Sequence, residues 1–317
     1  NPAAPLSSSG IKHYYVYFGT DQTALPSATQ TAATYTASVP TGVADSGLSY
    51  YLILRTEDNA GNISATSQLF VYRYDPKAPN FPPPTMKGYI DNTESYQITD
   101  QNLFYSYSDP YFEWHTEDQD CSSPDCAGLK AYYVGFSTDS SFDPATNPAY
   151  YTATGTYDVA ASGPALVSGW TYYLRGSVID FEDSEGNQSA VQTLWTYKYD
   201  NSDPDNPAAP VSGWATAGKS VALTNGDSYL YGNPYFEWGA PNDNPLGPLT
   251  SAGVAGYYVG FSTDNSSVPV YFQTAATYTA DAYDCNAYHY LRIRTRDSAT
   301  HTNATGAVTA FTYFWMG

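Results

Sequence analysis

The chain has 317 residues, of which 42% are hydrophobic, 14% are charged and 33 are tyrosine. Its net charge of −19, with only 12 Lys and Arg, excludes a basic surface for nucleic acid, because phosphates would be repelled. No stretch of 18 apolar residues is present, so we expect no membrane insertion. Abundant tyrosine, with 24 Gly and 22 Pro for turns, favours an all-β protein of two or three domains.

Residues 49–75 carry the clearest pattern in the first part of the chain. Alternating residues occur in two runs on either side of the turn sequence DNAGN at 58–62. Period-two alternation around an Asn/Gly-rich turn predicts a β-hairpin. Related runs recur around Tyr173 and Tyr290, so the sequence predicts tandem copies of one unit.

These copies predict three domains, at residues 1–75, 76–200 and 201–317, which we call repeats one, two and three. Residue 1 aligns with residue 244, in the middle of repeat three, so repeat one lacks the strands that precede that point. We therefore expect repeat one to be incomplete at its N-terminus, with an open edge and half a core. Two explanations stay open: the chain is an excerpt of a longer repetitive protein, or another copy supplies the missing strands.

Two proline-rich segments separate the repeats. They begin after Asp75 and Asp200, and their composition predicts stiff rather than flexible linkers. Each full repeat contains about seven runs typical of strands and no helical periodicity. We predict tandem Greek-key β-sandwiches.

Three motifs give the repeats a family likeness. They are FEW at 112–114, a Gly-x-x-x-Tyr-Tyr-Val strand, and a hairpin that ends in DNAGNIS at 58–64. This succession resembles bacterial fibronectin type III and related immunoglobulin-like repeats. The resemblance implies a β-sandwich and an extracellular or cell-surface location, and it implies function far less.

Aromatic residues at matching positions are expected in the cores. Trp114 and Trp238 share a face with Phe112 and Phe236. The last strands should likewise bury one face, made of Phe70, Tyr72 and Tyr74, then Trp195, Tyr197 and Tyr199, then Phe311, Tyr313 and Trp315. Trp170 and Trp214 lie outside these positions and are the expected exposed aromatics.

No catalytic constellation is evident, and we predict that the chain is not an enzyme. The four histidines do not match between repeats and are expected in loops or on the surface; they are His13, His115, His289 and His301. Glu113 and Glu237 recur one per repeat, whereas glycosidic chemistry needs two carboxylates around one bond.

Calcium is the one cofactor that the acidity favours, because Ca²⁺ takes oxygen ligands. The linker, one long loop and the hairpin tip should share one end of each repeat and gather carboxylates there. The predicted ligands are Glu117, Asp118, Asp120, Asp180, Glu182, Asp183, Asp200, Asp203 and Asp205, with Asp243 at the same end of repeat three. The alternative is a set of solvated acidic loops.

The three cysteines and four sequons bear on the compartment. Cys121 and Cys126 lie in one short loop and predict a local disulfide, whereas Cys285 is expected as a buried thiol. Asn-x-Ser/Thr sequons occur at Asn62, Asn187, Asn265 and Asn303. Three of them fall at the same hairpin tip, which shared ancestry of the repeats explains without glycosylation.

Two functional hypotheses follow. The first is an extracellular structural or adhesive protein, part of a rod, fibre, filament or surface layer, whose partners are further copies or neighbouring repeats. The alternative is a carbohydrate-binding or spacer module of a secreted hydrolase, with surface glycans as partners.

Overall fold

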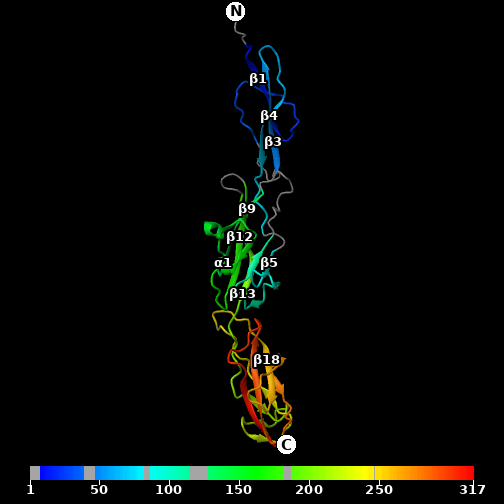
Figure 1. The fold of residues 1–317 in the computed structure, drawn as a ribbon, viewed down its shortest axis with the longest axis vertical. Coiled ribbons are helices and arrows are strands. Elements are labelled where there is room, and N and C mark those ends of the chain that lie inside the picture. The colour runs from blue at the N-terminus through cyan, green and yellow to red at the C-terminus, as the bar shows by residue number, and fades with distance from the viewer. Residues whose placement is uncertain (1–7, 39–46, 82–85, 115–127, 182–186, 246) are drawn as a thin grey trace, which may run out of the picture.

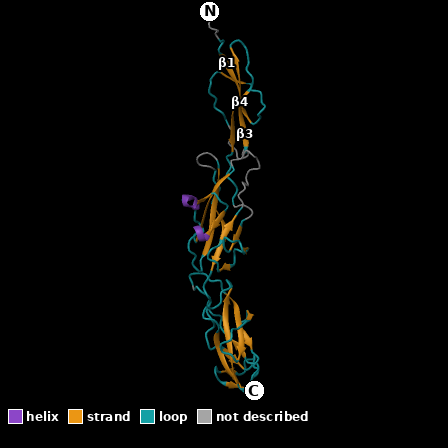
Figure 2. Cartoon of the chain, in the orientation of Figure 1, coloured by secondary structure: helices purple, strands orange, loops and turns teal. Residues whose placement is uncertain are grey.

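The computed structural model describes residues 8–38, 47–81, 86–114, 128–181, 187–245 and 247–317. Strands dominate, and the helices of these residues are short and confined to repeat two, namely η2 (Pro144–Thr146), η3 (Pro148–Tyr150) and α1 (Val159–Ser162) (Figure 2). Three groups of strands follow one another along the long axis of the molecule (Figure 1). Within the described ranges, no helix has the length and hydropathy needed to cross a bilayer.

Repeat one forms a single antiparallel sheet of order β2-β1-β3-β4. Its strands are β1 (Ile11–Gly19), β2 (Ala28–Gln30), β3 (Leu48–Asp58) and β4 (Ser67–Tyr74). The hairpin predicted from residues 49–75 is the β3–β4 pair. Its tip is an Asx-type turn in which Asp58 accepts from the backbone N–H groups of Ala60 and Asn62, each at 2.9 Å.

Repeat two is a complete sandwich of two sheets, β10-β9-β12-β13-β7 and β11-β8-β5-β6. The short strands are β5 (Lys87–Tyr89), β6 (Gln97–Ile98), β7 (Phe104–Tyr105), β8 (Tyr111–Glu113), β10 (Tyr151–Thr152) and β11 (Thr156–Asp158). The long strands are β9 (Leu129–Ser137), β12 (Thr171–Asp180) and β13 (Gln192–Tyr199). The arrangement confirms the expected all-β sandwich.

Repeat three repeats the same order, with sheets β16-β22-β21-β18-β19 and β15-β14-β17-β20. Its short strands are β14 (Ser212–Trp214), β15 (Ala222–Leu223), β16 (Ser228–Tyr229), β17 (Tyr235–Glu237), β19 (Tyr271–Gln273) and β20 (Thr277–Thr279). The long strands are β18 (Val254–Ser262), β21 (Ala287–Asp297) and β22 (Val308–Trp315). Comparison of the sheet orders shows that β2-β1-β3-β4 of repeat one corresponds to β19-β18-β21-β22.

The sandwich cores are aromatic, as predicted. Phe112 and Phe236 are fully buried, and the rings of Trp114 and Trp238 are buried beside them. In each core these side chains face the long strands of the other sheet, where alternation places every second residue inward.

Repeat one differs because, among its described residues, no second sheet covers the inner face. Phe70 is 58% exposed, whereas Phe311, at the same position of β22, is 2% exposed. Tyr72 is 39% exposed and Tyr74 is half-buried, so the prediction that the last strand buries its aromatic face is wrong for repeat one. It holds for repeats two and three, where Trp315 alone is half-buried.

Three further expectations need correction. His289 is fully buried, because its position in β21 is the inward position that Tyr172 occupies in β12. Cys285 is exposed in the turn that precedes β21, not buried. Trp170 is 43% exposed as predicted, but Trp214 is half-buried beneath the ammonium group of Lys219, which lies 4.9 Å from its ring centroid.

Candidate functional site

The hairpin tip has the same pair of hydrogen bonds at its base in all three repeats. In each repeat, an aspartate ends the strand before the tip. Its backbone N–H donates to the carbonyl of one residue across the turn, and its Oδ1 accepts from the N–H of that same residue. That pair is Asp58 with Asn62, Asp180 with Asn187, and Asp297 with His301. The tip therefore provides an internal comparison between three copies of one structure.

The copies differ at the second carboxylate oxygen. Asn62 Nδ2 donates to Asp58 Oδ2 at 2.8 Å, and Asn187 Nδ2 donates to Asp180 Oδ2 at 3.0 Å. In repeat three, histidine replaces this asparagine. His301 Nδ1 lies 3.7 Å from Asp297 Oδ2, beyond hydrogen-bond distance, and that oxygen is buried without a hydrogen-bond partner among the described residues.

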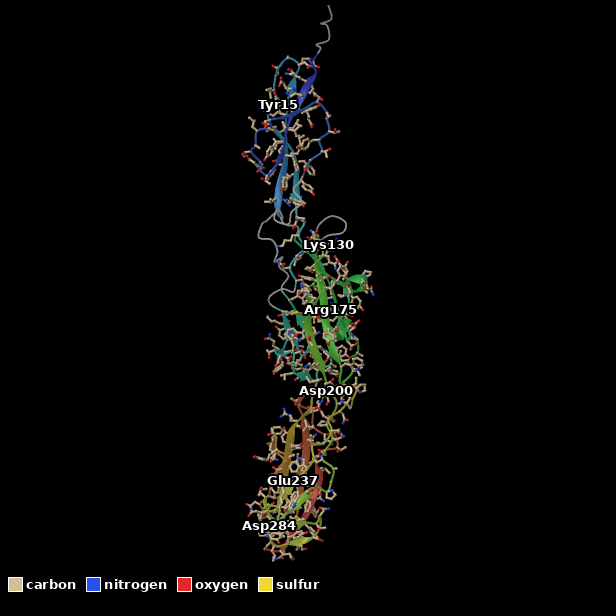
Figure 3. The ribbon with its side chains drawn as sticks, turned by 180° about the vertical axis from the view of Figure 1, so that it is seen from behind. Tyr15, Lys130, Arg175, Asp200, Glu237 and Asp284 are labelled. Atoms are coloured by element: carbon tan, nitrogen blue, oxygen red, sulfur yellow. The ribbon has the colours of Figure 1, made fainter. Side chains whose placement is uncertain are left out.

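Asp297 lies instead beside two other carboxylates. One ligand oxygen each from Asp200, Asp243 and Asp297 can be chosen so that all three lie within 4.8 Å of one another. Asp200 is 0% exposed and Asp297 is 1% exposed. We call these three residues the joint cluster; Figure 3 labels Asp200 where the second group of strands gives way to the third (Figure 3).

Asp200 follows the last strand of repeat two and is held from both repeats. Its Oδ1 accepts from Ser168 Oγ at 2.7 Å and from the Ser202 N–H at 3.0 Å. Its Oδ2 accepts from the N–H of Ala252, in repeat three, at 2.6 Å. Asp200 therefore connects the end of β13 to the loop that leads into β18.

Asp243, in a loop of repeat three, and Asp297, the last residue of β21, lie in two segments that Gly253 holds together. The Gly253 N–H donates to Asp243 Oδ2 at 2.5 Å, and its carbonyl accepts from the Ser298 N–H at 2.8 Å. Gly253 has a φ of 83°, in the left-handed region that glycine adopts without strain. A residue with a side chain would be disfavoured at this position.

The electrostatics of the cluster are unfavourable. Burial raises the pKa of Asp297 to about 6; the backbone N–H and the ring of His301 oppose the rise, and the charges of Asp243 and Asp200 add to it. Burial also raises the pKa of Asp243, the charge of Asp200 adds to that rise, and the Gly253 N–H opposes it. By contrast, the pKa of Asp58 is lowered, chiefly by the side chain and backbone N–H of Asn62.

The linker around the cluster is fixed by hydrogen bonds to repeat three. Asn303 Nδ2 donates to the Pro204 carbonyl at 2.7 Å, and Asn244 Nδ2 donates to the Asp203 carbonyl at 2.9 Å. Asn206 Oδ1 accepts from the Thr295 N–H at 2.9 Å. The second linker is therefore an ordered part of the joint.

Repeats two and three also touch directly. The Thr250 N–H donates to the Gly169 carbonyl at 3.1 Å. Gly169 packs so closely that a Cβ there would lie 2.5 Å from Pro245 Cγ and 2.7 Å from Leu249 Cβ. The joint thus combines polar contacts with close apolar packing.

Only part of the predicted calcium set comes together here. Asp200 and Asp243 belong to the cluster, whereas the side chain of Asp205 is exposed. Asp203 contributes to the joint only through its backbone carbonyl, which accepts from Asn244 Nδ2. Asp180 lies at the first joint, where its neighbour Asn187 also donates to the Asp75 carbonyl at 2.7 Å. Glu117, Asp118, Asp120, Glu182 and Asp183, and the cysteines Cys121 and Cys126, lie outside the described residues.

Asp297 was not among the predicted ligands, although the sequence held a signal for it. The tip of repeat three departs from the DNAGN pattern, and the asparagine that would satisfy its carboxylate is absent. Of the sequon residues, Asn62, Asn187 and Asn303 have hydrogen-bonded side-chain amides, and Asn265 lies in an exposed turn after β18. Glycosylation at all four stays a prediction.

A cleft beside the joint belongs to repeat three. It has a volume of about 740 Å³ and is lined partly by Asp205, Asn242, Glu237 and Trp238. Trp238 is 8% exposed, so its ring offers no open face for stacking on a sugar.

Comparisons with known proteins place the chain only loosely. No protein-family model and no curated protein matches it. Among solved structures, it is similar to the FN1–FN3 domains of chicken CNTN1, with 11% identity over 95% of this chain and 89% of that chain, at a TM-score of 0.28. It is also similar to the fibronectin(III)-like modules of Clostridium thermocellum CbhA, with 13% identity over 69% of this chain and 93% of that chain, at a TM-score of 0.31. At such TM-scores, neither likeness says what this chain does.

Proposed function

We propose that the chain is a stretch of an extracellular rod built from fibronectin type III-like modules, with a structural or adhesive role. The observation that carries the proposal is the ordered second joint. Its linker bonds repeat three through Asn206, Asn244 and Asn303, and Asp200 bonds both repeats. A joint made in this way favours one relative orientation of the modules over free rotation.

The first joint supports the same interpretation. Phe81, from the first linker, is 5% exposed and packs into the core of repeat two against Tyr132. Its carbonyl accepts a hydrogen bond from Gln192 in β13. Because this linker residue is part of a core, the first linker is held to repeat two at Phe81.

Small-angle scattering of the 317-residue chain tests the rod. β21 has 11 residues, and at about 3.3 Å per residue such a strand spans about 36 Å. Three modules placed end to end give a length of about 100 Å and a radius of gyration of roughly 30 Å. A compact globule of this chain length would have a radius of gyration of about 20 Å, and that value would refute the rod.

Self-association and glycan binding remain separate proposals about partners. The uncovered face of repeat one, with Phe70 and Tyr72 exposed, supports packing against a further module or copy. Sedimentation at increasing concentration measures this self-association, and a monomer at every concentration would count against a second copy.

The alternative function is a carbohydrate-binding or spacer module of a secreted hydrolase, and the exposed ring of Trp170 supports it. Retention of the chain on insoluble polysaccharide that is lost in W170A would favour this function.

A further inference from the structure

The third hairpin tip leaves one buried carboxylate oxygen without a partner. Asp297 is 1% exposed, and its Oδ2 has no hydrogen bond among the described residues. The equivalent oxygens of Asp58 and Asp180 each accept an asparagine amide. A buried polar atom in this state is costly, because its lost hydration is not replaced.

The unpartnered oxygen belongs to a residue of the joint cluster, which has two further carboxylates. Asp200, Asp243 and Asp297 bring three formal negative charges to oxygens within 4.8 Å of one another. In the part of the chain that the structure describes, His301 is the only basic residue within ion-pair distance of any of them. Three carboxylates this close repel strongly unless something positive lies between them.

We propose that the joint cluster binds one Ca²⁺ ion. The donors are all carboxylate oxygens, which suit a hard cation. Calcium binds oxygens at 2.3–2.6 Å, so oxygens on opposite sides of the ion lie about 4.6–5.2 Å apart, and oxygens within 4.8 Å of one another can share it. The hydrogen bonds to Asp200 do not block it, because each carboxylate has about four acceptor positions.

The ion would join the two repeats directly. Asp200 ends repeat two, whereas Asp243 lies in a loop of repeat three and Asp297 is the last residue of β21, so one cation would tie three segments together. Calcium would thus reduce bending at the second joint. This stiffening role rests on the proposed rod, whereas binding itself rests only on the cluster.

Calcium titration of the whole chain tests the site. The chain is freed of metal with a chelator and titrated with CaCl₂ by calorimetry, with MgCl₂ as a second titrant, and the variants D243N and D297N are treated in the same way. D58N, which alters the equivalent aspartate of repeat one, is the matched control. We expect one equivalent of Ca²⁺ to be lost, or bound at least tenfold more weakly, in D243N and D297N but not in D58N.

Several outcomes would overturn the site: no calcium binding, the same binding in D243N as in the parent chain, or a preference for Mg²⁺. Circular dichroism and a thermal scan show whether each variant is folded, and D243N is the safer variant because Asp243 lies outside the hairpin ladder. Scattering with calcium and with chelator separates the two claims. Binding without a change in the scattering curve would leave the site intact and refute stiffening, and a compact particle would refute the rod alone.

Discussion

The substitution His301→Asn tests how much free energy of folding the unpartnered oxygen of Asp297 costs at the third hairpin tip. The change restores the amide that Asn62 and Asn187 supply in the other repeats, where it donates to the aspartate at 2.8 Å and 3.0 Å. A hydrogen bond to a charged acceptor contributes about 1.5–3 kcal/mol. The lost attraction between Asp297 and His301, whose nitrogen lies 3.7 Å away, reduces the gain, so we expect a net stabilisation of about 1–2 kcal/mol in chelator.

Differential scanning calorimetry in chelator measures this effect. For a domain of roughly 100 residues, 1 kcal/mol corresponds to about 4–8 °C in Tm, so a gain of about 1–2 kcal/mol should raise the transition of repeat three by roughly 4–16 °C. The further rise in Tm that calcium gives the transition of repeat three should be smaller in H301N than in the parent chain, because the new amide competes with the ion for Asp297 Oδ2. The transitions of the other repeats should stay in place.

The reverse exchange, Asn187→His, is the matched control. It removes the bond to Asp180 and the 2.7 Å bond to the Asp75 carbonyl, so repeat two should lose stability. If H301N left the third transition unchanged or lowered it, the cost assigned to the unpartnered oxygen would be wrong. If N187H were neutral, the amide would have no value at either tip.

Three further predictions concern the core, a buried histidine and the joint. F311A should cost about 3–5 kcal/mol, whereas F70A at the matching exposed position should cost under about 1 kcal/mol, as measured by chemical unfolding. Burial lowers the pKa of His289, so the unfolded chain takes up a proton on this histidine before the folded chain does. The stability present above about pH 6.5 is therefore lost as the pH falls. H289Y should abolish this loss in thermal scans at pH 7.5 and 5.5, and an equal loss in both proteins would contradict the prediction. G169A should loosen the second joint in scattering, because both φ (88°) and contacts oppose a Cβ, whereas G226A, with a φ of 90° and open space, should carry only the backbone cost.

Local patterns were sufficient to predict the sandwich fold. Alternation around Leu174, Leu291 and their neighbours marks inward positions, and the structure buries both side chains completely. The FEW motif placed Phe112 and Trp114 in the core correctly. These predictions succeed because strand periodicity and aromatic burial act over a few residues.

The failures have a common cause, which is contact with distant parts of the chain. Phe70 and Phe311 carry the same local pattern, yet only Phe311 has a second sheet above it. His289 is unremarkable as a single residue, and its burial follows from the stacking of its ring on Phe261 in β18, at 5.2 Å between centroids. A local pattern specifies which face a side chain takes but not whether that face is covered.

The joint cluster shows the same limit at the site. The acidity and the chain order predicted Asp200 and Asp243 at one end of repeat three. Asp297 belongs to the cluster as well, because it lies at the hairpin tip where His301 replaces the asparagine that pairs with the aspartate in the other repeats. Replacement of an asparagine by His301 is harmful to a buried carboxylate unless another group takes over the role of the amide. The two neighbouring carboxylates cannot do so, because they repel Asp297. The proposed cation between the three would resolve both problems, the unpartnered oxygen and the concentrated charge, at the point where one repeat must be held to the next.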